Sequence, residues 1–148
     1  MEFYWACLKR EYRLLQEKLN STLIGFDYGL RKIGVSIGNT VSGVASPLKI
    51  LHSKSKIEGF KAAKEEVFFW DPELIVVGFP SYFDGGMHPL ANNCKRFARN
   101  ISFETGKKVR LIDESYTSVL SKGKGQDDAR AAALILQVVL DELFYANK

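Results

Sequence analysis

The chain has 148 residues, of which 46% are hydrophobic and 12% aromatic, and this composition excludes an intrinsically disordered protein. Lysine and arginine outnumber aspartate and glutamate by 21 to 17, so the charge permits a polyanionic partner without requiring one. The longest apolar run is too short to span a bilayer, and early charges exclude a secretory signal. We therefore expect a cytoplasmic protein with no membrane partner. The distant Cys7 and Cys94 predict neither a disulfide framework nor a zinc site.

The first twenty residues predict an amphipathic helix that precedes a domain spanning residues 21–148. Apolar side chains recur at spacings of three and four at Trp5, Leu8, Tyr12, Leu15 and Leu19. The face that carries Trp5 and Tyr12 is expected to cover either the domain core or a second subunit. A homodimer is therefore one of two expectations for this helix.

Three strands with short connections follow the helix. They are predicted at Leu23–Phe26, which leads to Asp27, at Ile33–Ile37 and at Val44–Leu51. Short connections indicate antiparallel pairing. Pro47 has no N–H group to donate, so the third strand is expected at an edge of the sheet.

Helices and strands then alternate to the end of the chain. The predicted elements are a helix over Lys56–Trp70, a strand over Leu74–Gly78, a helix over Pro89–Thr105, a strand over Val109–Ile112 and a helix over Asp127–Tyr145. In the first of these helices, Ile57, Phe60, Val67 and Phe68 are expected on or near one face. Strands separated by helices are typically parallel. The fold class is therefore α/β, with a mixed five-stranded sheet of three antiparallel and then parallel strands, flanked by helices.

Three acidic residues stand at element ends. Asp27 ends the first strand, Glu114 follows the last strand, and Asp128 opens the last helix. The first and fourth strands can be neighbours, so these acids can converge at the strands' carboxyl ends. Each acid also has a structural interpretation: Asp27 as a turn residue, Glu114 as an exposed strand end, and Asp127 or Asp128 as a helix N-cap.

Convergent carboxylates predict a specific chemistry. They repel one another unless cations neutralise them. Oxygen ligands suit Mg²⁺ or Mn²⁺, and such a cluster can hold two ions for in-line attack on a phosphodiester.

A motif around Asp27 resembles the opening motif of the YqgF/RuvX family. It reads Gly25-Phe26-Asp27-Tyr28-Gly29-Leu30-Arg31-Lys32-Ile33-Gly34-Val35-Ser36. Three further blocks resemble the family in the same order: Ile75–Pro80 followed by Asp84-Gly85, Leu111–Glu114 followed by Thr117, and Asp128–Gln137. The resemblance covers about residues 22–143. It implies an RNase H-like fold in which Asp27, Glu114 and Asp128 are catalytic acids that bind Mg²⁺ or Mn²⁺.

The resemblance also implies a function. It predicts a hydrolase, a two-metal-type endonuclease that acts on structured RNA in the 5′-end processing of pre-16S rRNA during ribosome biogenesis. A Holliday junction resolvase that acts on branched DNA is one alternative, and a non-catalytic RNA- or ribosome-associated factor with this fold is another. Two departures bear on these alternatives. Ser115 stands where the family usually has arginine, and only thirteen residues separate Glu114 from Asp128.

Basic residues near the acids are the candidate nucleic-acid ligands. Arg31 and Lys32 follow the turn after Asp27, and Lys122 and Lys124 lie in the loop that leads to Asp128. Alternatively, Arg31 and Lys32 are solvated charges of the hairpin. A further basic set either contacts phosphates or is solvated surface: Lys95, Arg96, Arg99, Lys107, Lys108 and Arg110.

Overall fold

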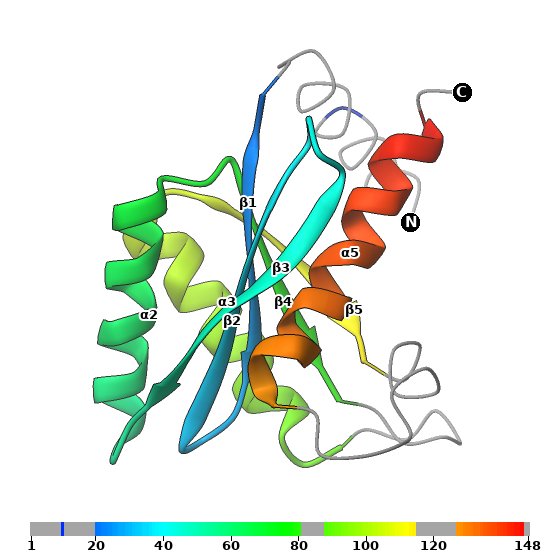
Figure 1. The fold of residues 1–148 in the computed structure, drawn as a ribbon. Coiled ribbons are helices and arrows are strands. Elements are labelled where there is room, and N and C mark those ends of the chain that lie inside the picture. The colour runs from blue at the N-terminus through cyan, green and yellow to red at the C-terminus, as the bar shows by residue number, and fades with distance from the viewer. Residues whose placement is uncertain (1–9, 11–19, 81–87, 115–126, 147–148) are drawn as a thin grey trace.

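The computed structural model describes residue 10 and residues 20–80, 88–114 and 127–146. The elements, in chain order, are β1 (Thr22–Tyr28), β2 (Lys32–Asn39), β3 (Val44–His52), α2 (Lys56–Trp70), β4 (Leu74–Phe79), α3 (Ala91–Thr105), β5 (Lys108–Asp113) and α5 (Asp128–Ala146) (Figure 1). Apart from residues 10 and 20, the predicted helix over residues 1–20 lies outside the described residues, as does the loop with Lys122 and Lys124. No helix in the described part of the chain combines the length and hydropathy needed to cross a membrane.

The five strands form one mixed sheet in the order β3-β2-β1-β4-β5. β1 pairs antiparallel with β2 and parallel with β4, while β2–β3 is antiparallel and β4–β5 parallel. The predicted mixed sheet is thus confirmed. β3 is an edge strand, as Pro47 indicated, and the ladder shifts register beside it, between Val35 and Ser36. β4 is buried from Leu74 to Gly78, as expected of a central parallel strand.

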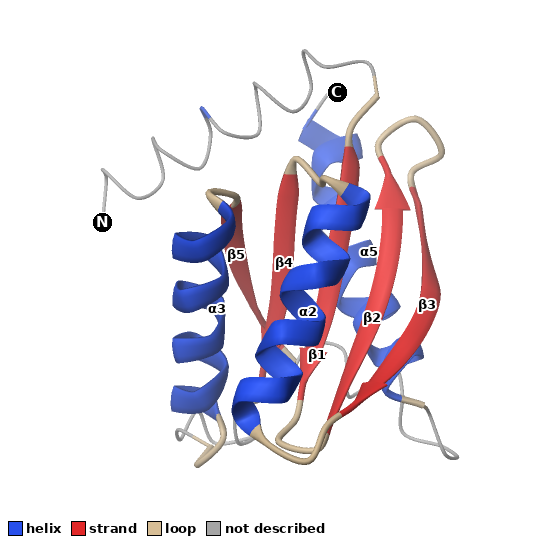
Figure 2. Cartoon of the chain, turned by 90° about the vertical axis from the view of Figure 1, so that its left-hand side faces the viewer, coloured by secondary structure: helices blue, strands red, loops and turns tan. Residues whose placement is uncertain are grey.

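Helices cover both faces of the sheet. Figure 2 shows α2 and α3 in front of the strands and α5 behind them. Successive strand residues face opposite sides, which gives two apolar layers. On the α2/α3 side the core includes Phe26, Val67 and Phe97, and on the α5 side it includes Leu23 and Leu136.

Helix α2 buries small side chains and leaves part of its apolar surface exposed. Its predicted bounds are confirmed, and Asp71 closes it in a left-handed conformation, with its N–H bonded to the carbonyl of Val67. Of the four apolar residues expected on or near one face, Val67 is buried, whereas Ile57 is 83% exposed and Phe68 is 59% exposed. The buried positions are the small residues Gly59 and Ala63, together with Val67. A Cβ at position 59 would lie 2.8 Å from Ser53 Oγ, so small side chains let this face approach the sheet closely.

The carboxyl ends of β1, β4 and β5 meet at one edge of the sheet, at the bottom of Figure 1. Helix α5 begins at the same edge (Figure 1). This edge therefore gathers the residues that follow the parallel strands and open the last helix.

Candidate active site

Asp27 lies between two glycines on the neighbouring strands, and we call this row of three paired residues the rung at Asp27. It pairs with Gly34 in β2 and with Gly78 in β4. Paired residues on neighbouring strands direct their side chains to the same face, which here is the face covered by α5. The absence of a side chain on both sides of Asp27 leaves room at this rung for groups from elsewhere in the chain.

Gly34 makes room for the start of α5. A Cβ at this position would lie 1.8 Å from the carbonyl oxygen of Asp128 and 2.2 Å from its carbonyl carbon. The backbone of Asp128 therefore rests directly on β2, next to Asp27. The neighbouring Asp127 caps the helix, because its Oδ1 accepts a hydrogen bond of 2.8 Å from the backbone N–H of Arg130. Capping thus falls to Asp127, and Asp128 is the first residue of the helix.

Gly78 makes room for Glu114. A Cβ at position 78 would lie 2.6 Å from Glu114 Oε1. The backbone N–H of Glu114 donates to the carbonyl of Phe79 at 2.9 Å, which fixes the chain where β5 ends. The side chain of Glu114 consequently lies across β4 and shares a hydrogen bond with the side chain of Asp27.

A hydrogen bond between two carboxyl groups requires a proton on one of them, and the electrostatics place it on Glu114. Burial, the hydrogen bond to Asp27 and the charge of Asp27 raise the pKa of Glu114 to about 9, with smaller contributions from Asp113 and Asp128. The pKa of Asp27 is also raised, chiefly by burial and then by the charge of Asp128, while its hydrogen bond with Glu114 opposes the rise. The three predicted acids are therefore close enough to interact electrostatically.

The donor set at this rung is made of carboxylate oxygens, which fit a hard cation such as Mg²⁺ or Mn²⁺. Among the described residues, no three or more His, Cys, Asp or Glu side chains are already arranged around a common point for a metal ion. The hydrogen bond between Asp27 and Glu114 occupies two of the candidate ligands. A cation bound between these carboxylates would take the place of their shared proton.

A basic pocket lies beside the turn that follows Asp27. Its volume is about 360 Å³, and its lining residues are Arg31, Lys32, His52, Ser53, Lys54 and Glu58. The predicted pair Arg31 and Lys32 is thus joined by residues from the end of β3 and the start of α2. The sequence did not identify Lys54 and His52 as members of this group. In the β2–β3 hairpin Lys32 pairs with His52, so the register of the hairpin is the signal that could have identified His52.

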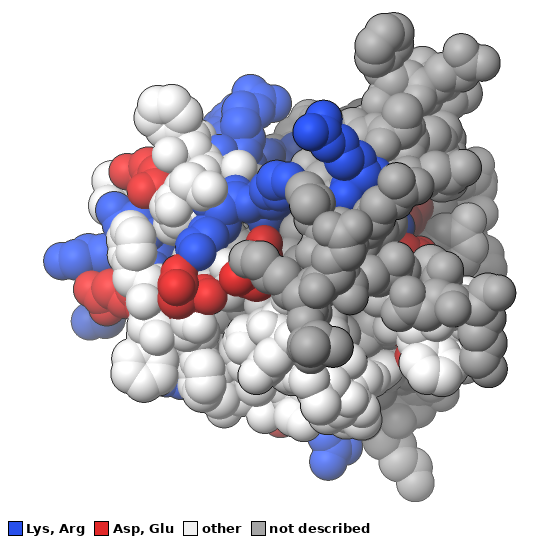
Figure 3. All heavy atoms as spheres, turned by 90° about the horizontal axis from the view of Figure 1, so that it is seen from above, with Lys and Arg blue, Asp and Glu red and all other residues white. Residues whose placement is uncertain are grey.

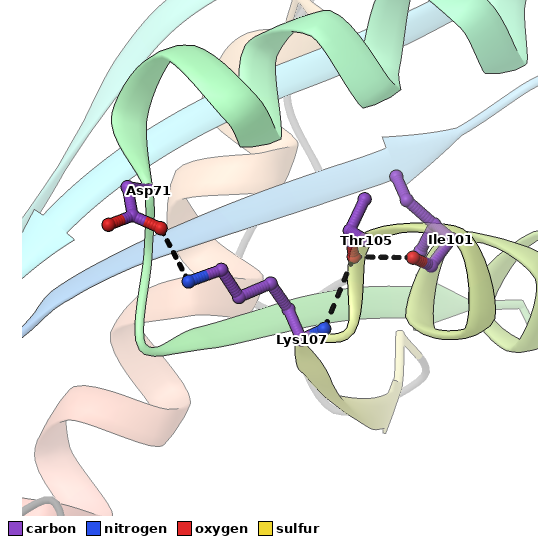
Figure 4. Close-up of polar contacts among 4 residues, drawn as sticks. All are labelled: Asp71, Ile101, Thr105 and Lys107. Carbon is purple, nitrogen blue, oxygen red and sulfur yellow. Dashed lines mark hydrogen bonds and ion pairs between the residues drawn. The ribbon is translucent and has the colours of Figure 1, made fainter.

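Part of the second basic set lies away from the acids, where β5 begins. Seen from above, from the edge opposite Asp27, lysine and arginine lie among aspartate and glutamate (Figure 3). Lys107 Nζ contacts Asp71 Oδ1 at 2.5 Å, and its backbone N–H donates to Thr105 Oγ1 at 3.3 Å (Figure 4). Arg110 forms an ion pair with Glu142. The structure thus gives Lys107 and Arg110 acidic partners within the protein.

The sheet order and the helices on both faces define the RNase H-like class of α/β domains. Among solved structures, the chain is similar to Thermus thermophilus RuvC in complex with a Holliday junction substrate, with a TM-score of 0.55 and 16% identity over 86% of this chain and 95% of that chain. It is also similar to the fowlpox virus Holliday junction resolvase, with a TM-score of 0.54 and 11% identity over 82% and 99% of the two chains. These similarities establish the fold.

Sequence comparison identifies the family within that class. Residues 21–142 match the RuvX family, described as Holliday junction resolvase. The chain is 41% identical over 126 residues to a Bordetella avium protein named "Putative pre-16S rRNA nuclease", covering 82% of this chain and 96% of that protein. A Paraburkholderia phytofirmans protein of the same name is 37% identical over 131 residues, covering 83% and 90%. The chain therefore belongs to the RuvX family, and this membership confirms the resemblance and supports a nuclease.

Proposed function

We propose that the protein is a metal-dependent nuclease that hydrolyses phosphodiester bonds in structured RNA, with the 5′-end processing of pre-16S rRNA as its reaction in the cytoplasm. The observation that carries the proposal is the rung at Asp27, where Gly34 and Gly78 admit the backbone of Asp128 and the side chain of Glu114. The names of the relatives from Bordetella avium and Paraburkholderia phytofirmans support RNA as the substrate.

In this proposal Asp27, Glu114 and Asp128 hold two Mg²⁺ or Mn²⁺ ions. The ions supply positive charge that stabilises the transition state of phosphodiester hydrolysis and acidifies water. Glu114 must lose its proton before it can act as an anionic ligand, and a nearby cation lowers its pKa. The carboxylates therefore bind metal in competition with protons.

In this proposal basic residues bind the substrate. Arg31 and Lys32, in one pocket with Lys54, bind backbone phosphates beside the cleavage site, because the pocket lies at the turn that follows Asp27. Lys122 and Lys124 are proposed as further phosphate ligands. Phosphate contacts of this kind position a nucleic acid without reading its sequence.

The second candidate function is resolution of branched DNA. The family description as Holliday junction resolvase and the fold shared with RuvC favour it. The two candidates use the same carboxylates and differ in the nucleic acid that is cleaved.

One experiment tests both candidates. Wild type and the variants Asp27→Asn, Glu114→Gln and Asp128→Asn are incubated with labelled structured RNA or four-way junction DNA, in Mn²⁺ or in EDTA. We expect RNA cleavage in Mn²⁺ that is lost in EDTA and in each variant. Asp127→Asn is the matched control, because asparagine retains the capping function and leaves the rung unchanged.

Other outcomes assign the protein differently. Cleavage of junction DNA alone indicates the resolvase. Cleavage that persists in EDTA, or full activity in any of the three variants, contradicts the metal-binding assignment of these acids. Binding of RNA without cleavage under any condition indicates a non-catalytic factor with this fold.

A further inference from the structure

A groove runs between α2 and α3 on the opposite face of β1 from the carboxylates. It begins at Tyr28, the residue after Asp27, whose side chain points to the α2/α3 side because successive strand residues alternate. The groove has a volume of about 260 Å³. The groove and the carboxylates therefore adjoin consecutive residues of β1, on opposite faces of the sheet.

The floor of the groove is aromatic. The Phe97 ring is buried and touches Tyr28, with ring centroids 4.7 Å apart and an angle of 33° between the rings. Phe60 meets the same ring edge-on at 6.1 Å, and Phe26 supports it from within the core at 5.7 Å. Tyr28 and Phe60 are only partly buried, so they expose ring surface to the groove while both rings pack against the buried Phe97.

Helix α3 adds amide groups beside this floor. Asn93, Phe97 and Asn100 are spaced by four and three residues, which places them on one face of the helix. All three line the groove. Each asparagine amide carries hydrogen-bond donors and an acceptor, so the wall offers both kinds of polar partner on either side of a ring.

The rim of the groove is positively charged. Arg96 and Lys56 line it from α3 and α2. Glu104 also lines it, but its carboxylate forms an ion pair with Lys64 at 3.7 Å. The charged residues of the lining thus favour an anionic group at the rim.

We propose that this groove binds an unstacked nucleobase of a single-stranded nucleic acid, next to the phosphodiester that is cleaved beside Asp27. Stacking on aromatic rings, hydrogen bonds to base edges and a cation for the adjoining phosphate are the three contacts by which proteins bind splayed-out bases. A volume of about 260 Å³ is below that of pockets for drug-sized ligands, so it suits a group as small as a single base. The inference rests on the proposed function for the claim that the chain binds nucleic acid.

The test compares two double variants on the same helix. Asn93→Ala/Arg96→Ala removes an amide and a cation from the groove. Asn92→Ala/Arg99→Ala removes the same two groups from exposed positions that do not line it. Both variants lose one positive charge, so a difference between them reports the groove and not the overall charge.

The readout is the fluorescence anisotropy of labelled single-stranded RNA and of DNA of the same sequence, measured in EDTA so that no cleavage occurs. We expect at least a tenfold loss of affinity in the groove variant and less than a twofold loss in the control. In wild type, replacing the bound base by an abasic site, scanned along the oligonucleotide, should weaken binding about 5- to 150-fold at one position, the range that corresponds to stacking of a single base. Unchanged melting temperatures in the two variants show that both are folded.

Equal losses in the two double variants, or an abasic scan with no sensitive position, overturn the inference. A groove variant that changes the oligomeric state in size-exclusion chromatography while binding oligonucleotides as wild type does assigns the groove to a protein partner and also overturns it. The fate of the proposed function is separate. RNA that is bound but never cleaved refutes the nuclease and leaves the groove standing, whereas cleavage with a groove variant equal to its control refutes only the groove.

Discussion

Replacing Gly34 by alanine tests the arrangement of the carboxylates directly. The added Cβ would lie 1.8 Å from the carbonyl oxygen of Asp128, whereas real Cβ contacts are essentially never closer than 3.0 Å. The obstructing atoms are backbone, so no side-chain rotation relieves the clash. The start of α5 must therefore move away from β2 by at least about 1.2 Å, and Asp128 must move with it.

The displacement predicts a larger effect on catalysis than on stability. A misplacement of about 1 Å in a catalytic constellation can cost about 100-fold in rate, while overpacking of a folded protein costs typically 1–3 kcal/mol. We therefore expect Gly34→Ala to remain folded, with a lower melting temperature, and to lose about 100-fold in the rate of RNA cleavage at saturating Mn²⁺. Single-turnover cleavage and a melting curve measure the two quantities.

Gly38→Ala provides the matched control on the same strand. Its Cβ would meet the side-chain ends of Leu140 and Leu136, at 2.8 and 3.2 Å, farther along α5. Flexible side-chain ends can move, so this variant should lose stability without a comparable loss of rate. Wild-type cleavage by Gly34→Ala, or equal rate losses in the two variants, would refute the reasoning that links the glycine rung to the position of Asp128.

The remaining predictions concern stability. Because the pKa of Glu114 is raised from 4.5 to about 9 in the folded protein, Glu114 contributes stability that is fully present below about pH 4.5 and is lost as the pH rises through about 9. In chemical denaturation in EDTA, Glu114→Gln should remove this part of the pH dependence, and an unchanged dependence contradicts the prediction. Asp27→Asn should not lower the melting temperature in EDTA, because the substitution removes a carboxylate whose pKa is raised by burial. Excess Mn²⁺ should raise the melting temperature of the wild type, and this increase should be smaller in the variant. A destabilised variant together with a wild type insensitive to Mn²⁺ would argue for a structural role of Asp27. Ser36→Ala should lower the free energy of unfolding in denaturant by about 1 kcal/mol, because it removes a buried hydrogen bond of 2.8 Å from the Ser36 hydroxyl to the carbonyl of Ala132. The control Ser46→Ala, at an exposed position, should leave that free energy unchanged. Equal effects of the two substitutions would contradict the role of the hydrogen bond.

Local signals in the sequence account for the elements and their ends. The helix at Lys56–Trp70 ends before Asp71-Pro72, as predicted, because the residue before a proline avoids the helical conformation. Gly106 closes α3 with a φ of 71°, a conformation that glycine adopts without strain. The continuous apolar run at Leu74–Gly78 indicated a central strand. Each of these signals lies within a few residues of the feature it predicts.

The alignment of the acids depends on contacts between distant parts of the chain. The sequence placed Asp27, Glu114 and Asp128 at element ends, but the pairing of β1 with β4 brings Gly78 beside Asp27 across fifty residues. The two glycines of the rung acquire their role only from what packs over them, which no local pattern encodes. The contact between Gly34 and the backbone of Asp128 likewise joins residues that are distant in the chain, and it places Asp128 against β2.

The choice of the buried face of α2 has the same physical origin. Apolar spacing placed Ile57 and Phe68 on or near one face of the helix, but the helix packs on the sheet through Gly59, Ala63 and Val67, where small side chains permit a close approach. Periodicity measures how apolar one face of a helix is. It does not measure how near the partner surface lies, and the free energy of packing depends on that distance. Sequence alone therefore determined the elements, their order and the acids at their ends, while tertiary packing decided the buried face of α2, the rung at Asp27 and the groove between α2 and α3.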